Sequence, residues 1–426
     1  VIYQNQIMKD LFDKIKSKPG PLEMWHDKAE GYYMFPELEG EIGSHMMFQG
    51  REVLCWSLNN YLGLANHPEV RKADAEAAAK YGMAYPMGAR VMSGQTKWHK
   101  QLETELANFS HKKYGCLINY GYQGIMSAID CLLDRHDVVV YDADCHASII
   151  DGIRMSDATR IKFRHNDVAD CEKKLQVATK KAEELGGGIL VITEGVFGMR
   201  GMQGKVKGIA DLKKKYDFRL LIDDAHGFGT QGHDGGGTHV EQGCADEVDV
   251  YCATFAKSMA STGGFIASND KAIITHCRYN MRSQIYAKSM PLVNVMGALK
   301  RLELIRNHPE FREKLWENVR MLQNGLRERG FDIGDLTSCV TPVYMKGSLE
   351  EATHVVADMR ENYRIFCSIV IPPVIPAGNI LLRLIPTNYH TKEDIQYTLD
   401  AFAQVRDKLA NKQYVTDKVA EVKLDV

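Results

Sequence analysis

Three side chains that follow two apolar runs have the most informative combination of chemistry in this chain. Lys257 lies in the segment Thr254-Phe255-Ala256-Lys257-Ser258, directly after the apolar run 250–253. Upstream, Asp223 follows the run Leu220-Leu221-Ile222, and His226 comes three residues later. A lysine, a carboxylate and a histidine at the ends of buried strands suit a cofactor that is held as a Schiff base. Pyridoxal phosphate is such a cofactor.

Each of the three residues has its own task in such a site. The ring of pyridoxal phosphate accepts electrons best when its nitrogen is protonated, which the Asp223 carboxylate would ensure. Lys257 would form the Schiff base, and partial burial would lower its pKa so that it is sometimes neutral. His226 would hydrogen-bond to the phenolic oxygen of the ring. A single lysine after an apolar run is most often a solvated surface residue, so the prediction depends on the three residues together.

The same pattern of strand ends recurs along the chain. Five short apolar runs alternate with helical patterns between about residue 115 and residue 270, which predicts parallel strands and crossover helices. The runs are 116–118, 138–141, 189–192, 220–222 and 250–253, and each is followed by polar or glycine-rich residues. The carboxyl ends of parallel strands meet at one edge of a sheet, where ligands of open α/β folds bind. We therefore expect an α/β fold whose mostly parallel sheet has helices on both faces and one site at that edge.

Two further positions after these runs are candidates for cofactor binding. Gly121 and Tyr122 open a helix directly after a strand, so their N–H groups could hold a phosphate at the positive end of that helix. The same residues are equally consistent with a plain helix start. His146 could lie flat over the cofactor ring, although a histidine in such a loop more often makes an ordinary hydrogen bond.

Other cofactor classes are less compatible with the sequence. Gly227-Phe228-Gly229-Thr230-Gln231-Gly232 matches the glycine pattern of NAD-dependent oxidoreductases, but it runs into turn residues 233–237 where that pattern should open a helix. The chain contains no G-x-x-x-x-G-K-[ST] sequence, which excludes a P-loop enzyme. His226, His233, His239 and Cys244 do not have the spacing of a familiar zinc site, so we predict no metal.

The pattern changes after residue 290. A long helical pattern and two strand-like segments, 340–344 and 380–384, lead to a final helix that begins with the capping sequence Thr391-Lys392-Glu393-Asp394. We expect an N-terminal segment at 1–55, a large cofactor-binding domain at 56–290, a smaller α+β domain at 291–412 and a charged tail at 413–426.

Composition and charge exclude several kinds of partner. The 426 residues are 25% charged and 45% hydrophobic, with a net charge of −2 and no basic blocks, so nucleic-acid binding is not expected. Ten cysteines without a C-x-x-C pair indicate buried apolar thiols in a reducing compartment, and we predict a cytoplasmic protein.

The amino terminus has one amphipathic segment. Ile7, Met8, Leu11, Phe12 and Ile15 mark one face of a helix that Pro19-Gly20 would end. This face is expected to pack on the body or on a second subunit, and peripheral contact with the inner membrane face is the alternative. No run approaches the roughly 18 apolar residues that span a bilayer.

Over nearly its whole length the chain resembles the α-oxoamine synthases, which are fold-type I pyridoxal phosphate enzymes. The resemblance rests on several motifs that follow one another in the order found in the family, namely Asn60-Tyr61-Leu62-Gly63-Leu64 with His67-Pro68, Gly88-Ala89-Arg90 through Gly94 with His99 and Leu102-Glu103, His146-Ala147-Ser148, Val196-Phe197-Gly198-Met199, Asp223-Asp224-Ala225-His226, Thr254 with Lys257, and Arg383 with His390-Thr391. Members of this family condense an amino acid with an acyl-CoA and release CoA and carbon dioxide.

The resemblance implies a role for each matching residue. Lys257, Asp223, His226 and His146 are the expected catalytic residues, with His146 stacked on the ring. Thr254 and the Gly121 and Tyr122 amides would bind the phosphate, and Arg383 with Asn60 would hold the substrate carboxylate. The family forms homodimers with the active site at the subunit interface, so Ala287 would reach the partner's phosphate. Gly198 and Ala287 depart from the family, because several relatives have a hydroxyl residue at each position.

The block 30–36 and the run 223–230 look most like bacterial serine palmitoyltransferases. The expected reaction therefore joins L-serine to a long-chain acyl-CoA such as palmitoyl-CoA, giving 3-ketodihydrosphingosine, CoA and carbon dioxide in sphingolipid biosynthesis. Glycine C-acetyltransferase or another α-oxoamine synthase is the alternative, since it would share every catalytic residue. A non-catalytic regulatory paralogue and an NAD-dependent oxidoreductase are alternatives of a different class, and retention of Lys257, Asp223 and His146 argues against the first.

Overall fold

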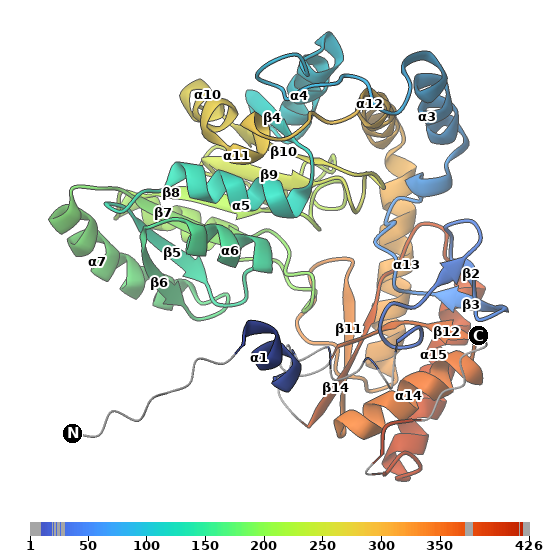
Figure 1. Cartoon of the computed structure of the whole chain (residues 1–426). Coiled ribbons are helices and arrows are strands. Elements are labelled where there is room, and N and C mark those ends of the chain that lie inside the picture. Colours follow the sequence, from blue (N-terminus) through green and yellow to red (C-terminus); the bar gives the residue numbers. More distant parts are fainter. Residues whose placement is uncertain are drawn as a thin grey trace.

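A seven-stranded sheet forms the centre of the larger part of the molecule, as the computed structural model shows (Figure 1). The structure describes residues 10–18, 20, 23, 26, 30–370, 378–416 and 418–420. Within the sheet, β10 pairs antiparallel with both of its neighbours and the other pairs are parallel. In spatial order the strands are β4 (Tyr114–Ile118), β10 (Gly264–Ser268), β9 (Val250–Thr254), β8 (Arg219–Asp223), β7 (Ile189–Glu194), β5 (Val138–Asp142) and β6 (Thr159–Phe163).

Helices cover both faces of this sheet, which explains why the strands are continuous apolar runs. Val138 and Val140 of β5 belong to the core on one face, and Val139 belongs to the core on the other. The first core includes α4 (Lys97–Phe109), α7 (Val168–Leu185) and α12 (Leu292–Asn307), and the second includes α5 (Gly121–Leu132), α6 (Ala147–Met155) and α10 (Lys271–Asn280). Further helices in this part are α3 (Pro68–Tyr81), α8 (Val206–Asp211), α9 (Thr238–Glu241) and α11 (Arg282–Ile285). The predicted α/β fold with a mostly parallel sheet is confirmed.

All five strands predicted for this sheet are present, and two further strands of the sheet were not predicted. β6 is an edge strand in which charged residues alternate with apolar ones, so it lacks the apolar run that marks the others. β10 begins at Gly264, the second of two adjacent glycines, and inserts antiparallel between β4 and β9. The glycine-rich segment 227–236 contains no helix, in agreement with the turn residues that follow it.

A smaller α+β unit has a hydrophobic core of its own. Its antiparallel sheet has the order β11 (Thr341–Lys346), β14 (Asn379–Leu384) and β13 (Ser368–Val370). Three helices accompany it, namely α13 (Pro309–Glu328), α14 (Leu349–Glu361) and α15 (Lys392–Ala410). The predicted capping box is present at the start of α15, where Thr391 and Asp394 each bond the other's backbone N–H.

The packing divides the chain differently from the ranges predicted from the sequence. The amino-terminal strands β1 (Leu38–Glu39), β2 (His45–Phe48) and β3 (Arg51–Cys55) form a sheet with β12 (Ile365–Phe366), and β3 and β12 are parallel. Residues from Tyr32 to Trp56 therefore share one core with residues 322–414. α12 packs instead in the core of the large sheet. The pairing of β3 with β12 joins segments about 310 residues apart, which no local sequence pattern can indicate.

A helix is present at the amino-terminal end as predicted, whereas part of the predicted tail at the other end is packed. The amino-terminal helix α1 spans Leu11–Ser17 and has no buried residue, while Ile7, Met8 and Pro19 lie outside the described residues. Its packing on a subunit or a membrane stays a prediction. At the other end, Tyr414 is buried and Ala420 donates its N–H to Thr353, so part of the predicted tail packs on α14. Among the described residues, no helix combines the length and apolar character needed to cross a bilayer.

The junction between the amino-terminal segment and α15 can be tested at Trp56. This side chain is fully buried, stacks on His390 at 3.8 Å and donates its Nε1–H to Thr398 at 3.0 Å. Trp56→Phe removes the hydrogen bond and leaves a void, so we expect a loss of about 2 kcal/mol in stability. The control Trp98→Phe alters a half-buried indole and should cost less than about 0.5 kcal/mol. Equal shifts in the thermal unfolding temperature of the two variants would contradict this assignment.

Candidate active site

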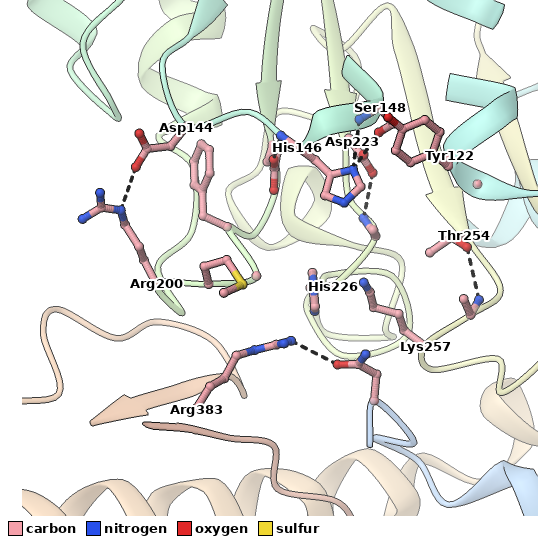
Figure 2. Close-up of a pocket in the computed structure, with 18 of the residues that line it drawn as sticks. Tyr122, Asp144, His146, Ser148, Arg200, Asp223, His226, Thr254, Lys257 and Arg383 are labelled. Atoms are coloured by element: carbon pink, nitrogen blue, oxygen red, sulfur yellow. Dashed lines mark hydrogen bonds and ion pairs between the residues drawn. The ribbon is translucent and has the colours of Figure 1, made fainter. Parts of the chain in front are cut away.

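A cavity of about 550 Å³ lies at the carboxyl edge of the large sheet. The loops after β4, β5, β7, β8 and β9 contribute to its lining, together with residues of β11 and β14 from the smaller unit. Figure 2 shows His146 and Asp223 on one side of this space and Lys257, His226 and Arg383 on the other. Eight predicted site residues line the cavity, namely Gly121, Tyr122, His146, Asp223, His226, Thr254, Lys257 and Arg383.

The environment of Lys257 makes its amine reactive. Burial lowers the pKa of Lys257 to about 8, and the positive charge of Arg383 acts in the same direction. The carboxylates of Asp223 and Glu194 oppose this shift. A lysine with this pKa is partly neutral near physiological pH, which nucleophilic attack on an aldehyde requires.

Asp223 is a buried carboxylate without a cationic hydrogen-bond partner among the described residues. It ends β8, and its Oδ1 accepts a hydrogen bond from the N–H of Ala225 at 3.1 Å. Burial raises the pKa of Asp223, while the Lys257 ammonium acts in the opposite direction. A protonated ring nitrogen placed against this carboxylate would supply the missing positive charge.

Glu194 is a site residue to which the sequence analysis gave no role. It ends β7 beside Asp223 in the sheet register, and burial raises its pKa well above the usual range. Its Oε1 accepts the backbone N–H of His146 at 2.5 Å. Glu194 therefore fixes the position of His146, and its place two residues after an apolar run was the available signal.

His146 caps α6 and extends its ring beside the cavity. Its Nδ1 lies 2.8 Å from the hydroxyl of Ser148. Burial lowers the pKa of His146, and Lys257 adds to the effect. A neutral imidazole held in this way can present its flat face to an aromatic ring.

His226 is buried, and its position depends on two neighbours. Its Nδ1 lies 2.6 Å from the hydroxyl of Tyr61. A Cβ at Gly198 would overlap its Nε2, so the glycine found in place of the family's serine leaves room for this histidine. A serine could not occupy position 198 without displacing His226.

The other end of the cavity has the features of a phosphate site. α5 begins at Gly121 and no side chain caps it, so the N–H groups of its first turn lack the usual partner. A Cβ at Gly121 would lie 2.8 Å from the Oγ1 of Thr254, which brings the hydroxyl against the helix start. Backbone donors, a hydroxyl and the helix dipole together suit a phosphate.

The structure corrects the residue predicted to assist Arg383. The Oδ1 of Asn60 accepts the N–H of Ala65 at 3.2 Å, and Asn60 does not line the cavity. Its neighbour Asn59 lines the cavity, and the Oδ1 of Asn59 accepts a hydrogen bond from Arg383 Nη2 at 3.2 Å. The two asparagines are adjacent in the sequence, so the motif identified the segment but not which side chain faces the site.

The remaining predicted positions lie outside the cavity. Ala287 is half-buried after α11, and its contact with a partner's phosphate stays a prediction.

Of the residues considered for zinc, His226 lines the cavity, whereas His239 is buried against the carbonyl of Ser110. Within the described ranges, a surface group brings three potential metal ligands within 4.8 Å of one another, namely His111, His233 and Asp234.

The lining residues as a set fit pyridoxal phosphate. The phosphate end, a carboxylate for the ring nitrogen, an imidazole for the ring face and a lysine with a lowered pKa all border one cavity. Pyridoxal phosphate is the cofactor of this site.

Known proteins similar to this chain agree with that geometry. A sequence model of the aminotransferase class I and II family matches residues 51–402. A cysteate-C-fatty acyltransferase of Capnocytophaga ochracea is 60% identical, over 96% of this chain and 97% of its own length. A serine palmitoyltransferase of Bacteroides thetaiotaomicron is 36% identical, over 87% of this chain and 92% of its own. The structure of a variant of the S. paucimobilis serine palmitoyltransferase with a bound PLP–myriocin aldimine superposes with a TM-score of 0.86 at 28% identity, covering 95% of this chain and all of that one.

The pKa of Lys257 predicts how attachment of the cofactor depends on pH. The neutral fraction of the amine rises as pH increases through about 8, so the rate of covalent attachment to the apoprotein should rise about tenfold per pH unit below that value and level off above it. Stopped-flow absorbance after mixing apoprotein with pyridoxal phosphate measures this rate. Lys257→Ala should show no covalent phase, and a rate that does not change between about pH 6 and pH 9 would contradict the assignment.

Proposed function

Because the chain belongs to the aminotransferase class I and II family and, within it, to the α-oxoamine synthases, we propose that it condenses cysteate with a long-chain acyl thioester. The amino-acid carboxylate leaves as carbon dioxide, the thiol is released, and the product is an α-amino ketone that retains the sulfonate. The observation that carries this proposal is the 60% identity with a cysteate-C-fatty acyltransferase over nearly the whole of both chains.

L-serine, the substrate expected from the sequence, becomes the second candidate. The serine palmitoyltransferase of B. thetaiotaomicron is 36% identical, which is much less than the 60% of the cysteate enzyme. Both names describe the same type of reaction, so the difference concerns the side chain of the amino acid. Cysteate carries a sulfonate where serine carries a hydroxyl.

The charge of the cavity is compatible with a substrate that has two anionic groups. Arg383 has no carboxylate partner among the described residues, and its buried Nε has no hydrogen-bond partner. Arg200 also lines the cavity, and its Nε donates to Asp144 at 2.7 Å. Figure 2 shows both arginines on the side of the cavity away from Thr254. Two guanidinium groups there favour a carboxylate and a sulfonate over a carboxylate alone.

Each side chain of the site has a separate role in the reaction. When bound, pyridoxal phosphate supplies a ring that withdraws electrons from the carbon that reacts. Lys257, with its pKa near 8, accepts the proton from the substrate Cα as a neutral amine and later returns it. Asp223 holds the proton on the ring nitrogen, and His146 covers the ring. Arg383 and Asn59 hold the substrate carboxylate in the orientation from which carbon dioxide departs.

One side of the cavity is apolar and would bind the acyl chain of the thioester. Phe197, Met199, Tyr344 and Leu381 line the cavity near the two arginines. These side chains suit the first carbons of a long acyl chain. A coenzyme A thioester is the form expected from the resemblance.

A homodimer is part of the proposal. Large apolar side chains are exposed near the segment that the resemblance places at the subunit interface, including Met87 at 75%, Met92 at 84% and Tyr286 at 84%. Burial of such side chains against a second copy would remove their contact with water. It would also bring the partner's Ala287 segment to the cavity.

The choice of amino acid is tested by comparing cysteate and serine with purified protein and palmitoyl-CoA. Because the site would be built around an ionised sulfonate, we expect kcat/KM for cysteate to exceed that for serine by about 100-fold or more. Release of the thiol measures both rates, and glycine serves as the test of the glycine C-acetyltransferase alternative. A preference for serine or glycine would overturn the cysteate assignment and leave the reaction type unchanged.

The two neighbouring asparagines form a matched pair for testing the carboxylate site. Asn59→Ala removes a partner of Arg383, so KM for the amino acid should rise about tenfold with little change in stability. Asn60→Ala leaves the N–H of Ala65 without its partner, so it should lower the unfolding temperature and change KM less. The reverse pattern would show that Asn60 serves the substrate.

A further inference from the structure

Tyr61 is a buried residue beside the cavity to which the proposed function gives no task. It lies between β3 and α3, is 0% exposed, and does not itself line the cavity. Its hydroxyl oxygen is 2.6 Å from Nδ1 of His226, and the two rings meet edge to face at 6.1 Å. The residues are 165 positions apart in the chain.

The protonation states of this pair follow from their surroundings. Burial lowers the pKa of His226 well below its usual value, and the charges of Lys257 and Arg383 act in the same direction, so the imidazole is neutral. Burial raises the pKa of Tyr61 well above its usual value, so the phenol keeps its proton. A neutral imidazole has one N–H donor and one bare nitrogen that accepts.

The direction of the hydrogen bond follows from the other groups near Tyr61. The guanidinium of Arg383, whose charge lowers the pKa of the Tyr61 phenol, can only donate hydrogen bonds. The nearby thiol of Cys339 is a weak acceptor. Nδ1 of His226 is therefore the best acceptor within reach of the Tyr61 proton. If Tyr61 donates to Nδ1, the proton of the imidazole must be on Nε2.

Nε2 of His226 faces Gly198, because a Cβ added at Gly198 would overlap this nitrogen. Both His226 and Gly198 line the cavity. We propose that Tyr61 is a positioning residue that holds His226 in the Nε2–H form, so that the site offers an N–H donor to the phenolic oxygen of the cofactor. The opposite tautomer would present a lone pair to that oxygen and repel it.

The backbone around Tyr61 is fixed by the smaller unit. Its carbonyl accepts the N–H of Asn388 at 3.0 Å, and Asn388 Nδ2 donates to the carbonyl of Leu62 at 2.9 Å. Gly63 has a φ of +69°, and a Cβ there would overlap the Asn388 side chain. This segment is therefore held by the unit that also supplies Arg383, and the tautomer of His226 depends on contacts between the two units.

The direct test is the tautomer of His226 in the wild-type apoprotein. Nitrogen-15 NMR of protein labelled at histidine distinguishes a protonated ring nitrogen from a bare one, and His226→Gln assigns the signal. We expect the proton on Nε2 and a bare Nδ1. A proton on Nδ1, or on both nitrogens near neutral pH, would overturn the proposal without the need for any variant at position 61.

The variant Tyr61→Phe tests the consequence for cofactor binding. Without the hydroxyl, we expect a mixture of both tautomers and a dissociation constant for pyridoxal phosphate that is about tenfold higher. Tyr251→Phe is the matched control, because it removes another buried phenol, which donates to Asp224 at 3.2 Å and does not line the cavity. Unchanged tautomer and cofactor affinity in a folded Tyr61→Phe protein, relative to this control, would contradict the role of Tyr61.

This inference rests on the proposed function only in placing pyridoxal phosphate in the cavity. Neither the NMR measurement nor the affinity measurement uses an amino acid or a thioester. A preference for serine over cysteate would therefore leave the result for Tyr61 unaffected, and a failure at Tyr61 would leave the substrate assignment unaffected.

Discussion

The burial of a lysine amine opposite a buried carboxylate is the interaction on which the rest of the site depends. Asp223 ends β8, Lys257 follows the neighbouring strand β9, and each affects the pKa of the other. Burial disfavours the charged form of both groups, whereas their mutual attraction favours it. The balance leaves Lys257 partly neutral, and among the described residues it leaves Asp223 without a cationic hydrogen-bond partner. A cofactor with an aldehyde at one end of its ring and a basic nitrogen at the other satisfies both needs.

The remaining contacts orient the groups around that pair. Glu194 holds the backbone of His146, Tyr61 holds His226, and Asn59 holds Arg383. In each case a buried or partly buried hydrogen bond fixes a residue whose side chain faces the cavity. The second residue of each pair lies on a different segment from the first, so the geometry of the site depends on the packing of both units of the molecule.

The sequence predicted most of the large domain because its signals are local. Apolar runs such as 138–141 and 189–192 are long enough to show burial on both faces, and the polar residues after them identified the edge of the sheet that forms the site. The contacts that were missed are non-local. The pairing of β3 with β12, the contact of Tyr61 with His226 and the pairing of β10 with β4 each depend on packing between distant segments. The prediction of Asn60 in place of Asn59 was wrong for another reason. In an irregular segment the direction of a side chain depends on the local turn of the backbone, and here the hydrogen bond from the N–H of Ala65 holds the Asn60 side chain.

The central claim is that Lys257 is the residue that carries pyridoxal phosphate. Reduction of the cofactor-loaded protein with borohydride converts the bond between lysine and cofactor into a stable one, and mass spectrometry of its peptides then locates the modified residue. We predict a single pyridoxyl group on the peptide that contains Lys257. Modification of a different lysine, or none at all in protein that binds the cofactor, would contradict the account.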